Sequence, residues 1–222
     1  MKKVLFLTLL LFSLAVHAAA QAVPYTREKE WEKEISAMLE IDVRQTPPSN
    51  PVLFTGSSSI RMWRSLRLDF PHLNVINRGF GGSHLEDLVF FAPKIVLPYK
   101  PKKIVVYSGE NDVEVGQSAD NVLADFKAFV DFRDKSLPGI PIVYISMKPS
   151  VLRWAKWPEM KRGNDLIKAE AARRKRITFV DISERMLGAD GRPRPELFLA
   201  DGLHLNAAGY ALWREILLPY LK

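Results

Sequence analysis

The chain has 222 residues, a formal net charge of +7 at pH 7 and no cysteine. The lack of cysteine excludes disulfide bonds and thiolate metal sites, so burial of apolar side chains has to hold the fold together. The positive charge does not indicate a nucleic-acid site, because the basic residues are not interleaved with aromatic ones. The densest basic cluster, residues 173–176, ends a predicted helix, where cations complement the helix dipole.

The N-terminal residues have the pattern of a secretory signal peptide. Lys2 and Lys3 precede an apolar run over residues 4–16, and small residues follow at 18–20. The apolar run is shorter than the roughly 20 residues that a membrane-spanning helix needs, and no later segment is predicted to cross a membrane. We therefore expect residues 1–20 to be removed on export. Residues 21–222 should then form a single domain in the periplasm or outside the cell.

Helical and strand-like patterns alternate along the rest of the chain. Short runs rich in apolar and β-branched residues predict strands buried on both faces, at residues 52–55, 74–77, 104–108, 142–146 and 177–182. Amphipathic patterns predict helices at residues 27–43, 83–91, 119–135, 158–175 and 207–221. This alternation predicts an α/β fold, with helices on both sides of a parallel sheet and right-handed crossovers.

Polar loops follow the ends of these predicted strands, at residues 56–59, 79–82, 109–112, 147–150 and 201–204. In open parallel sheets, ligands bind beyond the carboxyl ends of the strands, so these loops should converge at one edge of the sheet. Packing alone does not explain so many polar loops at one edge. Their convergence indicates a functional site.

The first loop contains three consecutive serines, Ser57, Ser58 and Ser59, after Gly56. A serine-rich turn before a helix is often only an N-cap. A serine at a helix start can also act as a nucleophile, because the backbone N–H groups there stabilise a developing oxyanion. These residues alone do not choose among the three serines. They do not form the G-x-S-x-G elbow either, since Ile60 stands where the second glycine would be.

Two further loops offer hydrogen-bond donors. Gly79, Gly81 and Gly82 expose backbone N–H groups without a Cβ to block close approach, and Asn111 offers a neutral amide donor. The alternatives are a flexible glycine turn, a phosphate-binding loop and a simple Asn-Asp turn. Neither the Walker pattern nor G-x-G-x-x-G is present, so the sequence favours an oxyanion hole over a phosphate site.

The last loop places Asp201 three residues before His204. A carboxylate at this spacing can orient one ring nitrogen while the other nitrogen accepts a proton from a serine. A structural histidine is one alternative. A metal site is another, but His72 and His84 lie in different predicted loops, so we expect no metal. A hydroxyl, a base and an orienting acid are the groups that nucleophilic ester hydrolysis requires.

In this order the motifs resemble the SGNH hydrolases, also called GDSL-type esterases and lipases, and especially exported bacterial members whose first block reads Gly-Ser-Ser-Ser-Ile-Arg. The resemblance spans residues 31–221. It implies a flavodoxin-like three-layer α/β/α sandwich with five parallel strands in the order 2-1-3-4-5. It also implies ester hydrolysis without a cofactor.

The resemblance further implies roles for single residues. Ser58 would be the nucleophile, His204 the base and Asp201 its orienting acid. The backbone N–H groups of Ser58 and Gly82 and the Asn111 side chain would form the oxyanion hole. Ser57 stands where the family usually has aspartate. That aspartate is not a member of the triad, so only the local support of the nucleophile is expected to differ.

The loop after the fourth predicted strand is expected to line the substrate pocket. Arg153 would hold an anionic group of the substrate or a surface carboxylate. Trp154 and Trp157 would stack on sugar rings, with surface packing as the alternative. Because no long apolar insertion could form a lid, we expect short-acyl esters, such as acetylated carbohydrate, as substrates. The alternatives are a lysophospholipase or thioesterase that uses the same site, and a non-catalytic sugar-binding protein of the cell envelope.

Overall fold

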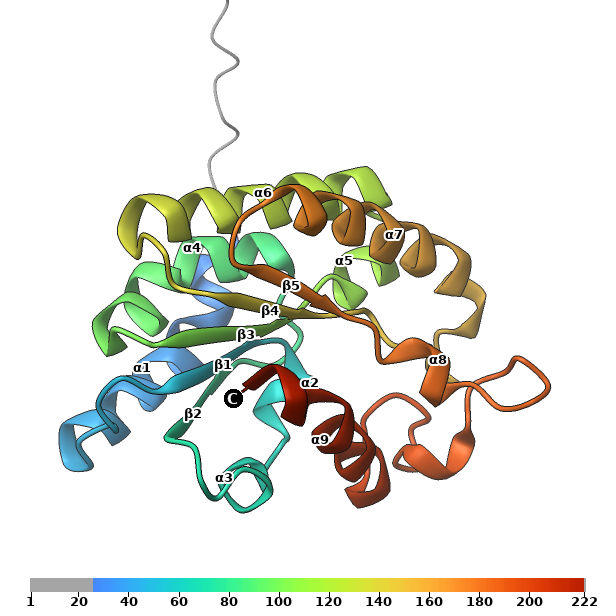
Figure 1. The fold of residues 1–222 in the computed structure, drawn as a ribbon, viewed down its shortest axis with the longest axis horizontal. Helices are drawn as coiled ribbons and strands as arrows, with labels where there is room; N and C mark the ends of the chain where they lie inside the picture. Colours follow the sequence, from blue (N-terminus) through green and yellow to red (C-terminus); the bar gives the residue numbers. More distant parts are fainter. Residues whose placement is uncertain (1–25, 222) are drawn as a thin grey trace, which may run out of the picture.

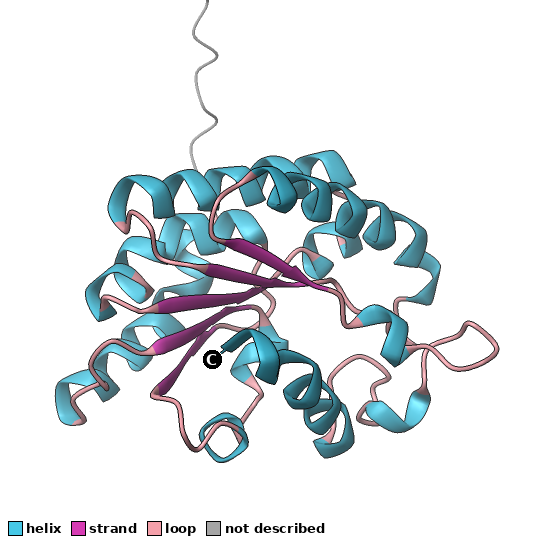
Figure 2. Cartoon of the chain, in the orientation of Figure 1, coloured by secondary structure: helices cyan, strands magenta, loops and turns pink. Residues whose placement is uncertain are grey.

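The computed structural model describes residues 26–221, so the predicted signal peptide lies outside the described residues. Its centre is a five-stranded parallel sheet in the order β2-β1-β3-β4-β5 (Figure 1). The strands are β1 (Val52–Gly56), β2 (Val75–Gly79), β3 (Lys103–Tyr107), β4 (Ile142–Ile145) and β5 (Ile177–Val180). The predicted strand order and the three-layer α/β/α architecture are confirmed (Figure 2).

Helices cover both faces of the sheet. One face packs against α1 (Glu28–Arg44), α4 (Leu85–Ile95), α6 (Ala119–Ser136) and α7 (Trp157–Arg173). The other face packs against α9 (Ala207–Leu221) and the short helices α2 (Ser58–Arg61), α3 (Leu66–Asp69) and α8 (Ser183–Met186). Within residues 26–221, no helix has the length and apolar character needed to cross a membrane.

The two faces of the sheet have separate hydrophobic cores. On β3, Ile104 and Val106 face the core under α4 and α6, whereas Val105 and Tyr107 face the core under α9. Successive side chains of a strand point to opposite faces, so a strand buried on both sides needs a continuous apolar run. This requirement explains why β1 to β4 were recognisable from the sequence, whereas β5 is less buried than predicted, since its Thr178 is exposed. On the α9 side, Trp63 is fully buried and its ring packs against other aromatic rings.

Strand β2 continues two residues beyond its predicted end. Arg78 and Gly79 pair with Thr55 and Gly56 of β1, although neither residue belongs to an apolar run. Arg78 is buried because its guanidinium forms an ion pair with Asp42 of α1. The apolar pattern could not reveal this extension, since a partner from another helix compensates the buried charge.

Gly56 sets the distance between the ends of β1 and β3. Its φ angle is +120°, and a Cβ built on it would lie 1.9 Å from the carbonyl oxygen of Tyr107. The same carbonyl accepts the N–H of Ser57 at 2.9 Å. Only glycine allows both the positive φ and the close contact. The turn that begins at Gly56 therefore starts α2, with Ser58 at its first position, against the end of β3.

We predict that Gly56→Ala destabilises the protein by about 3 kcal/mol or more, because an unfavourable φ adds to a steric overlap with backbone. Gly139→Ala is the matched control, since Gly139 also has a positive φ, +80°, but its Cβ would meet nothing within 4 Å. The control should lose only about 1–2 kcal/mol. Urea unfolding of both variants measures the difference, and equal losses would contradict the proposed contact.

Candidate active site

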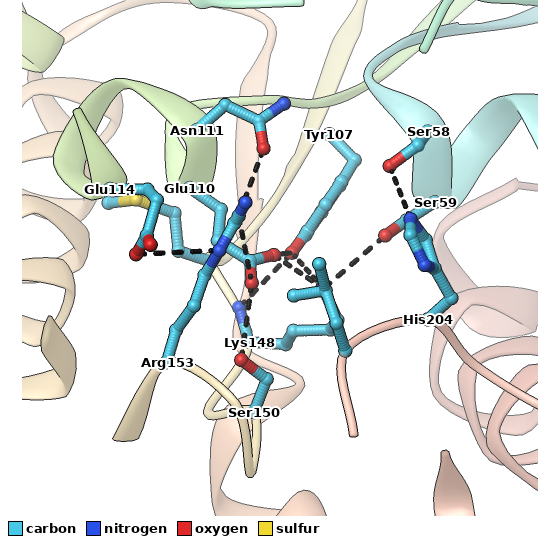
Figure 3. A network of polar contacts seen from close by, with 12 residues as sticks. Ser58, Ser59, Tyr107, Glu110, Asn111, Glu114, Lys148, Ser150, Arg153 and His204 are labelled. Atoms are coloured by element: carbon cyan, nitrogen blue, oxygen red, sulfur yellow. Dashed lines mark hydrogen bonds and ion pairs between the residues drawn. The ribbon is translucent and has the colours of Figure 1, made fainter. Parts of the chain in front are cut away.

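The structure brings the three predicted triad residues together, although Ser58 and His204 lie 146 positions apart in the chain. The Nε2 atom of His204 lies 3.0 Å from the hydroxyl of Ser58. The Nδ1 atom of His204 lies 2.6 Å from Oδ2 of Asp201. Figure 3 shows the imidazole ring of His204 next to the Ser58 hydroxyl, joined to it by a dashed line. Among the three serines, Ser58 is therefore the one in contact with the histidine.

Asp201 is held as a carboxylate. Partial burial opposes its ionisation, but the hydrogen bond with the His204 side chain and those from the backbone N–H groups of Leu203 and His204 outweigh this effect. Together they lower the pKa of Asp201 to about 2. Both backbone groups donate to Oδ1 at 2.9 Å, which leaves Oδ2 for the imidazole. An ionised acid in this position fixes the ring and favours the imidazolium that forms on proton transfer.

A short closed loop presents the Asp201–His204 pair. An isolated antiparallel bridge between Phe198 and Leu205 closes the loop at its base. Just after it, the side chain of Asn206 accepts the N–H groups of Ala208 and Gly209 at the start of α9, at 2.9 and 3.1 Å. The amide of Asn206 also donates to the carbonyls of Glu196 and Phe198. This one side chain thus caps the helix and ties the loop to it.

The predicted oxyanion donors belong to the segments that follow β1, β2 and β3. Among residues 26–221, no acceptor takes the N–H of Ser58 or of Gly82. Gly82 has a φ of +72°, and a Cβ there would lie 3.3 Å from the Trp31 ring. Gly81 is held differently, because its N–H points to the carboxylate of Glu34 at 3.2 Å. Helix α1, which carries both Trp31 and Glu34, therefore supports the glycine loop, and this role was not predicted from the sequence.

The Asn111 side chain is held at both ends. Its Nδ2 atom donates to the carbonyl of Ser83 at 2.9 Å, and its Oδ1 atom accepts from the Arg153 guanidinium at 2.9 Å. Asn111 belongs to α5 (Glu110–Glu114), which begins directly after β3. A carboxamide nitrogen carries two hydrogens, so one N–H remains for another acceptor after the bond to Ser83.

A buried polar network lies beneath these loops and was missed by the sequence reasoning. Glu110 and Lys148 form an ion pair in which the side chains are only 3% and 1% exposed. The hydroxyl of Tyr107 also donates to Glu110, and Lys148 reaches the hydroxyl of Ser59 at 3.4 Å. Burial by itself raises the pKa of Glu110, but the charges of Lys148 and Arg153 outweigh it and hold the pKa below its usual value.

The loop after β4 differs from its predicted role as a pocket lining. Lys148, Pro149 and Ser150 are buried beneath the site instead of lining a pocket. Trp154 and Trp157 are half-buried and stack on each other, with ring centroids 6.3 Å apart. Trp157 also packs against the core under α6, so for this residue the structure supports the packing alternative.

Arg153 is held by α5 and does not point freely into a pocket. Its guanidinium lies 3.5 Å from carboxylate oxygens of both Glu110 and Glu114, in addition to its bond with Asn111. The sequence signal that could have found this arrangement is weak: two acidic residues flank Asn111 within α5, and a cation follows β4 at the same sheet edge.

Asp112 is a second buried acid next to the site. Its Oδ1 atom accepts the N–H of Leu85 at 2.9 Å, whereas its buried Oδ2 atom has no hydrogen-bond partner among residues 26–221. Burial is the main cause that raises the pKa of Asp112 to about 7. The folded protein therefore favours the protonated form of this carboxyl group.

Two other features bear on ligands. Within the described part of the chain, no group of three or more His, Asp or Glu side chains is arranged to hold a metal ion. A cavity of about 430 Å³ lies between α1 and α2, where Met38, Arg61 and Arg64 are among its walls, and it contacts neither Ser58 nor His204. At the candidate site, Ser58 is partly exposed.

Comparison with known proteins decides the family. Residues 31–212 match the model of the GDSL-like Lipase/Acylhydrolase family. The chain belongs to this family. As a GDSL-like acylhydrolase, it is a carboxylic ester hydrolase. No curated protein sequence matches the chain.

Solved structures share the fold at low sequence identity. A Streptococcus pneumonia protein named for platelet activating factor is 20% identical, with a TM-score of 0.77 over 87% of this chain and 94% of its own. A GDSL-like lipase from Bacteroides thetaiotaomicron is 20% identical, with a TM-score of 0.69 over 87% and 96%. An acetyl-xylooligosaccharide esterase from Geobacillus Stearmophilus is 17% identical, with a TM-score of 0.63 over 80% and 96%.

We predict that Lys148→Met destabilises the protein by about 3–5 kcal/mol, because it leaves Glu110 buried without its main counter-charge. The double variant Lys148→Met/Glu110→Gln should recover at least half of this loss. Lys161→Met is the control, since Lys161 also forms an ion pair but is 61% exposed, and it should lose less than about 1 kcal/mol. Urea unfolding measures all three, and a double variant no more stable than Lys148→Met would refute the pairing argument.

We also predict that Asp112→Asn stabilises the protein more at pH 8 than at pH 5. The pKa of Asp112 is about 7 in the folded state, above roughly 3.9 in the unfolded state. The contribution of this carboxyl group to the free energy of unfolding is therefore fully present below about pH 4 and is lost as the pH rises through about 7. The amide keeps the acceptor for Leu85 but does not ionise.

The stabilisation by Asp112→Asn should increase by about 2 kcal/mol from pH 5 to pH 8, measured by chemical unfolding. Asp165→Asn, at an exposed site, is the control and should show no such increase. A pH-independent effect of Asp112→Asn would contradict the raised pKa.

Proposed function

We propose that the chain hydrolyses short-acyl esters through a covalent acyl-enzyme on Ser58. The observation that carries the proposal is the continuous line of contacts from Ser58 through His204 to Asp201, with distances of 3.0 and 2.6 Å. In this arrangement the imidazole can take the proton of the hydroxyl while the ionised Asp201 stabilises the resulting imidazolium.

The reaction has two steps. In the first, the Ser58 oxygen bonds to the ester carbonyl carbon while its proton passes to Nε2 of His204. The bond to the leaving alkoxide then breaks, and His204 protonates the alkoxide. In the second step, His204 takes a proton from water, the resulting hydroxide attacks the acyl carbon, and Ser58 leaves with the proton returned. The N–H groups of Ser58 and Gly82 and the amide of Asn111 would stabilise both oxyanions.

Two features support short acyl groups, with acetylated carbohydrate as the preferred class. Ser58 lies at the surface, and the part of the chain between 26 and 221 has no long apolar insertion over it. The half-buried ring of Trp154 lies on the adjacent loop, where a sugar could stack. A structural neighbour is named as an acetyl-xylooligosaccharide esterase, which makes acetylated sugars a reasonable first substrate class.

A second candidate, a lysophospholipase or thioesterase, is favoured by one observation. Val151 and Leu152 are 44% and 62% exposed, and the N–H of Leu152 binds the carbonyl of Gly202 within the Asp201–His204 loop. Two exposed apolar side chains beside the histidine loop could hold a longer acyl chain. Acyl-chain preference therefore separates the two candidates.

The test is hydrolysis of p-nitrophenyl acetate and p-nitrophenyl octanoate by the protein and by Ser58→Ala. We expect the acetate ester to be the better substrate and Ser58→Ala to lose at least about 10³-fold in kcat. Ser57→Ala is the matched control, since Ser57 is a buried neighbour without the contact to His204, and it should keep most of the activity.

Asp201→Asn should be impaired less than Ser58→Ala, because Asp201 supports the proton transfer without performing it. Activity that survives in Ser58→Ala would refute the proposed nucleophile. A preference for the octanoate ester would favour the second candidate. A protein inactive on both esters, and also on acetylated oligosaccharides, would favour a non-catalytic sugar-binding role.

A further inference from the structure

We propose that Arg153 is a positioning residue that fixes the orientation of the Asn111 amide, and that the buried Glu110–Lys148 pair holds Arg153 in place. The inference rests on the proposed function, because it assigns Asn111 to the oxyanion hole. It gives Arg153 a role different from the anion-binding role expected from the sequence.

Both ends of the Asn111 carboxamide form hydrogen bonds. Oδ1 accepts from Nη1 of Arg153 at 2.9 Å, and Nδ2 donates to the Ser83 carbonyl at 2.9 Å. If the amide were rotated by 180°, its NH₂ group would face a guanidinium and its oxygen would face a carbonyl. Both contacts would then be repulsive. Figure 3 shows the oxygen of Asn111 directed at Arg153 and the nitrogen directed away from it.

Arg153 is itself held by contacts besides its hydrogen bond to Asn111. Its side chain is only 13% exposed, and it lies 3.5 Å from Glu110 on one side and 3.5 Å from Glu114 on the other. Glu110 and Glu114 are the first and last residues of α5, the helix that carries Asn111. These two ion pairs hold the guanidinium between carboxylates of the helix, while its Nη1 atom makes the hydrogen bond to Asn111.

The buried Glu110–Lys148 pair is connected to Arg153 through Glu110. Glu110 shares its charge between Arg153 and Lys148, and it also accepts from Tyr107 and from Ser150 at 3.3 Å. A buried ion pair is weak evidence for stability, because desolvation of both charges offsets most of their attraction. Here the pair joins the nucleophile turn, which Lys148 reaches through Ser59, to the helix of Asn111 (Figure 3). The network therefore fixes two groups of the site relative to each other.

The consequence is a specific effect on turnover. A free Asn111 amide would populate both orientations, and only one of them presents an N–H to the oxyanion. Arg153→Met should therefore lower kcat for p-nitrophenyl acetate by about 10-fold while KM changes less than about twofold, since a well-placed donor is worth about 10²–10³ in rate. Arg153→Lys should retain an intermediate kcat, because a lysine can donate to Oδ1 but cannot bridge both carboxylates.

A double-mutant cycle with Asn111→Ala is the decisive experiment. If Arg153 acts through Asn111, adding Arg153→Met to Asn111→Ala should change kcat by less than about twofold. Glu114→Gln provides a second variant that does not threaten the fold, since Glu114 is 41% exposed, and its kcat should fall by a smaller factor. Arg185→Met, which loses an exposed ion pair with Glu215 far from the site, should keep wild-type kcat.

Three results would overturn the proposal. Equal losses from Arg153→Met in the wild-type and Asn111→Ala backgrounds would indicate a structural role. An increase in KM confined to an anionic ester, with kcat unchanged, would indicate substrate binding by Arg153. Wild-type kcat in both Arg153→Met and Glu114→Gln would show that the amide needs no support.

Labelling of Ser58 by a fluorophosphonate separates failure of this inference from failure of the proposed function. In labelling, the serine oxygen bonds to phosphorus, fluoride leaves, and the negative phosphoryl oxygen uses the same donors. We expect slower labelling in Arg153→Met than in the wild type. A wild-type protein that neither labels nor hydrolyses esters would overturn the nucleophile and, with it, the positioning role. A labelled wild type with equally fast labelling of Arg153→Met would overturn the positioning role alone.

Discussion

The ion pair between Glu110 and Lys148 is buried where β3 and β4 end, and the loops of the candidate site are built around it. Two buried charges are costly unless each is fully paired and hydrogen-bonded. Glu110 meets this condition through Lys148, Tyr107, Ser150 and Arg153. These partners lie at the end of β3 and in the loop that follows β4. Pairing of Glu110 therefore fixes these two segments relative to each other.

A second constraint acts on the nucleophile side. The close contact of Gly56 with the Tyr107 carbonyl brings the end of β1 against the end of β3. Tyr107 also donates to Glu110, so the strand that receives the nucleophile turn belongs to the buried network too. The positions of Ser58 and Asn111 therefore depend on the same few contacts, which suits a reaction in which nucleophile and oxyanion donor must act on one carbonyl group.

The histidine side of the site is attached differently. Its loop depends on Asn206, on the bridge between Phe198 and Leu205 and on the contact between Leu152 and Gly202. Asp201 and His204 are accordingly more exposed than Glu110 and Lys148. The candidate site therefore combines a buried half, which carries the ion pair, with a more exposed half, which carries the histidine.

The longer helices, the strands and the parallel α/β class could be predicted from sequence patterns, whereas the strand order came from the family resemblance. Strands buried on both faces need continuous apolar runs, and helices that cover a sheet need a periodic apolar stripe, so both leave a local pattern. A helix that starts at Ser58 was expected from the serine turn, but the short helices α3, α5 and α8 were not predicted, because four or five residues are too few for a periodic pattern. Strand β2 was predicted too short, because its last two residues are held by backbone pairing and by the ion pair with Asp42, which leave no apolar pattern in the sequence.

Within the site, the sequence by itself determined which residue types were available and that their loops would meet at the carboxyl edge of a parallel sheet. It left the choice among Ser57, Ser58 and Ser59 to a family resemblance, and only the fold shows that His204 contacts Ser58. Only the tertiary structure placed Arg153 against Asn111 and joined Glu110 to Lys148. Such pairs join residues about 40 positions apart and have no periodicity, so nothing short of the folded chain brings their charges together.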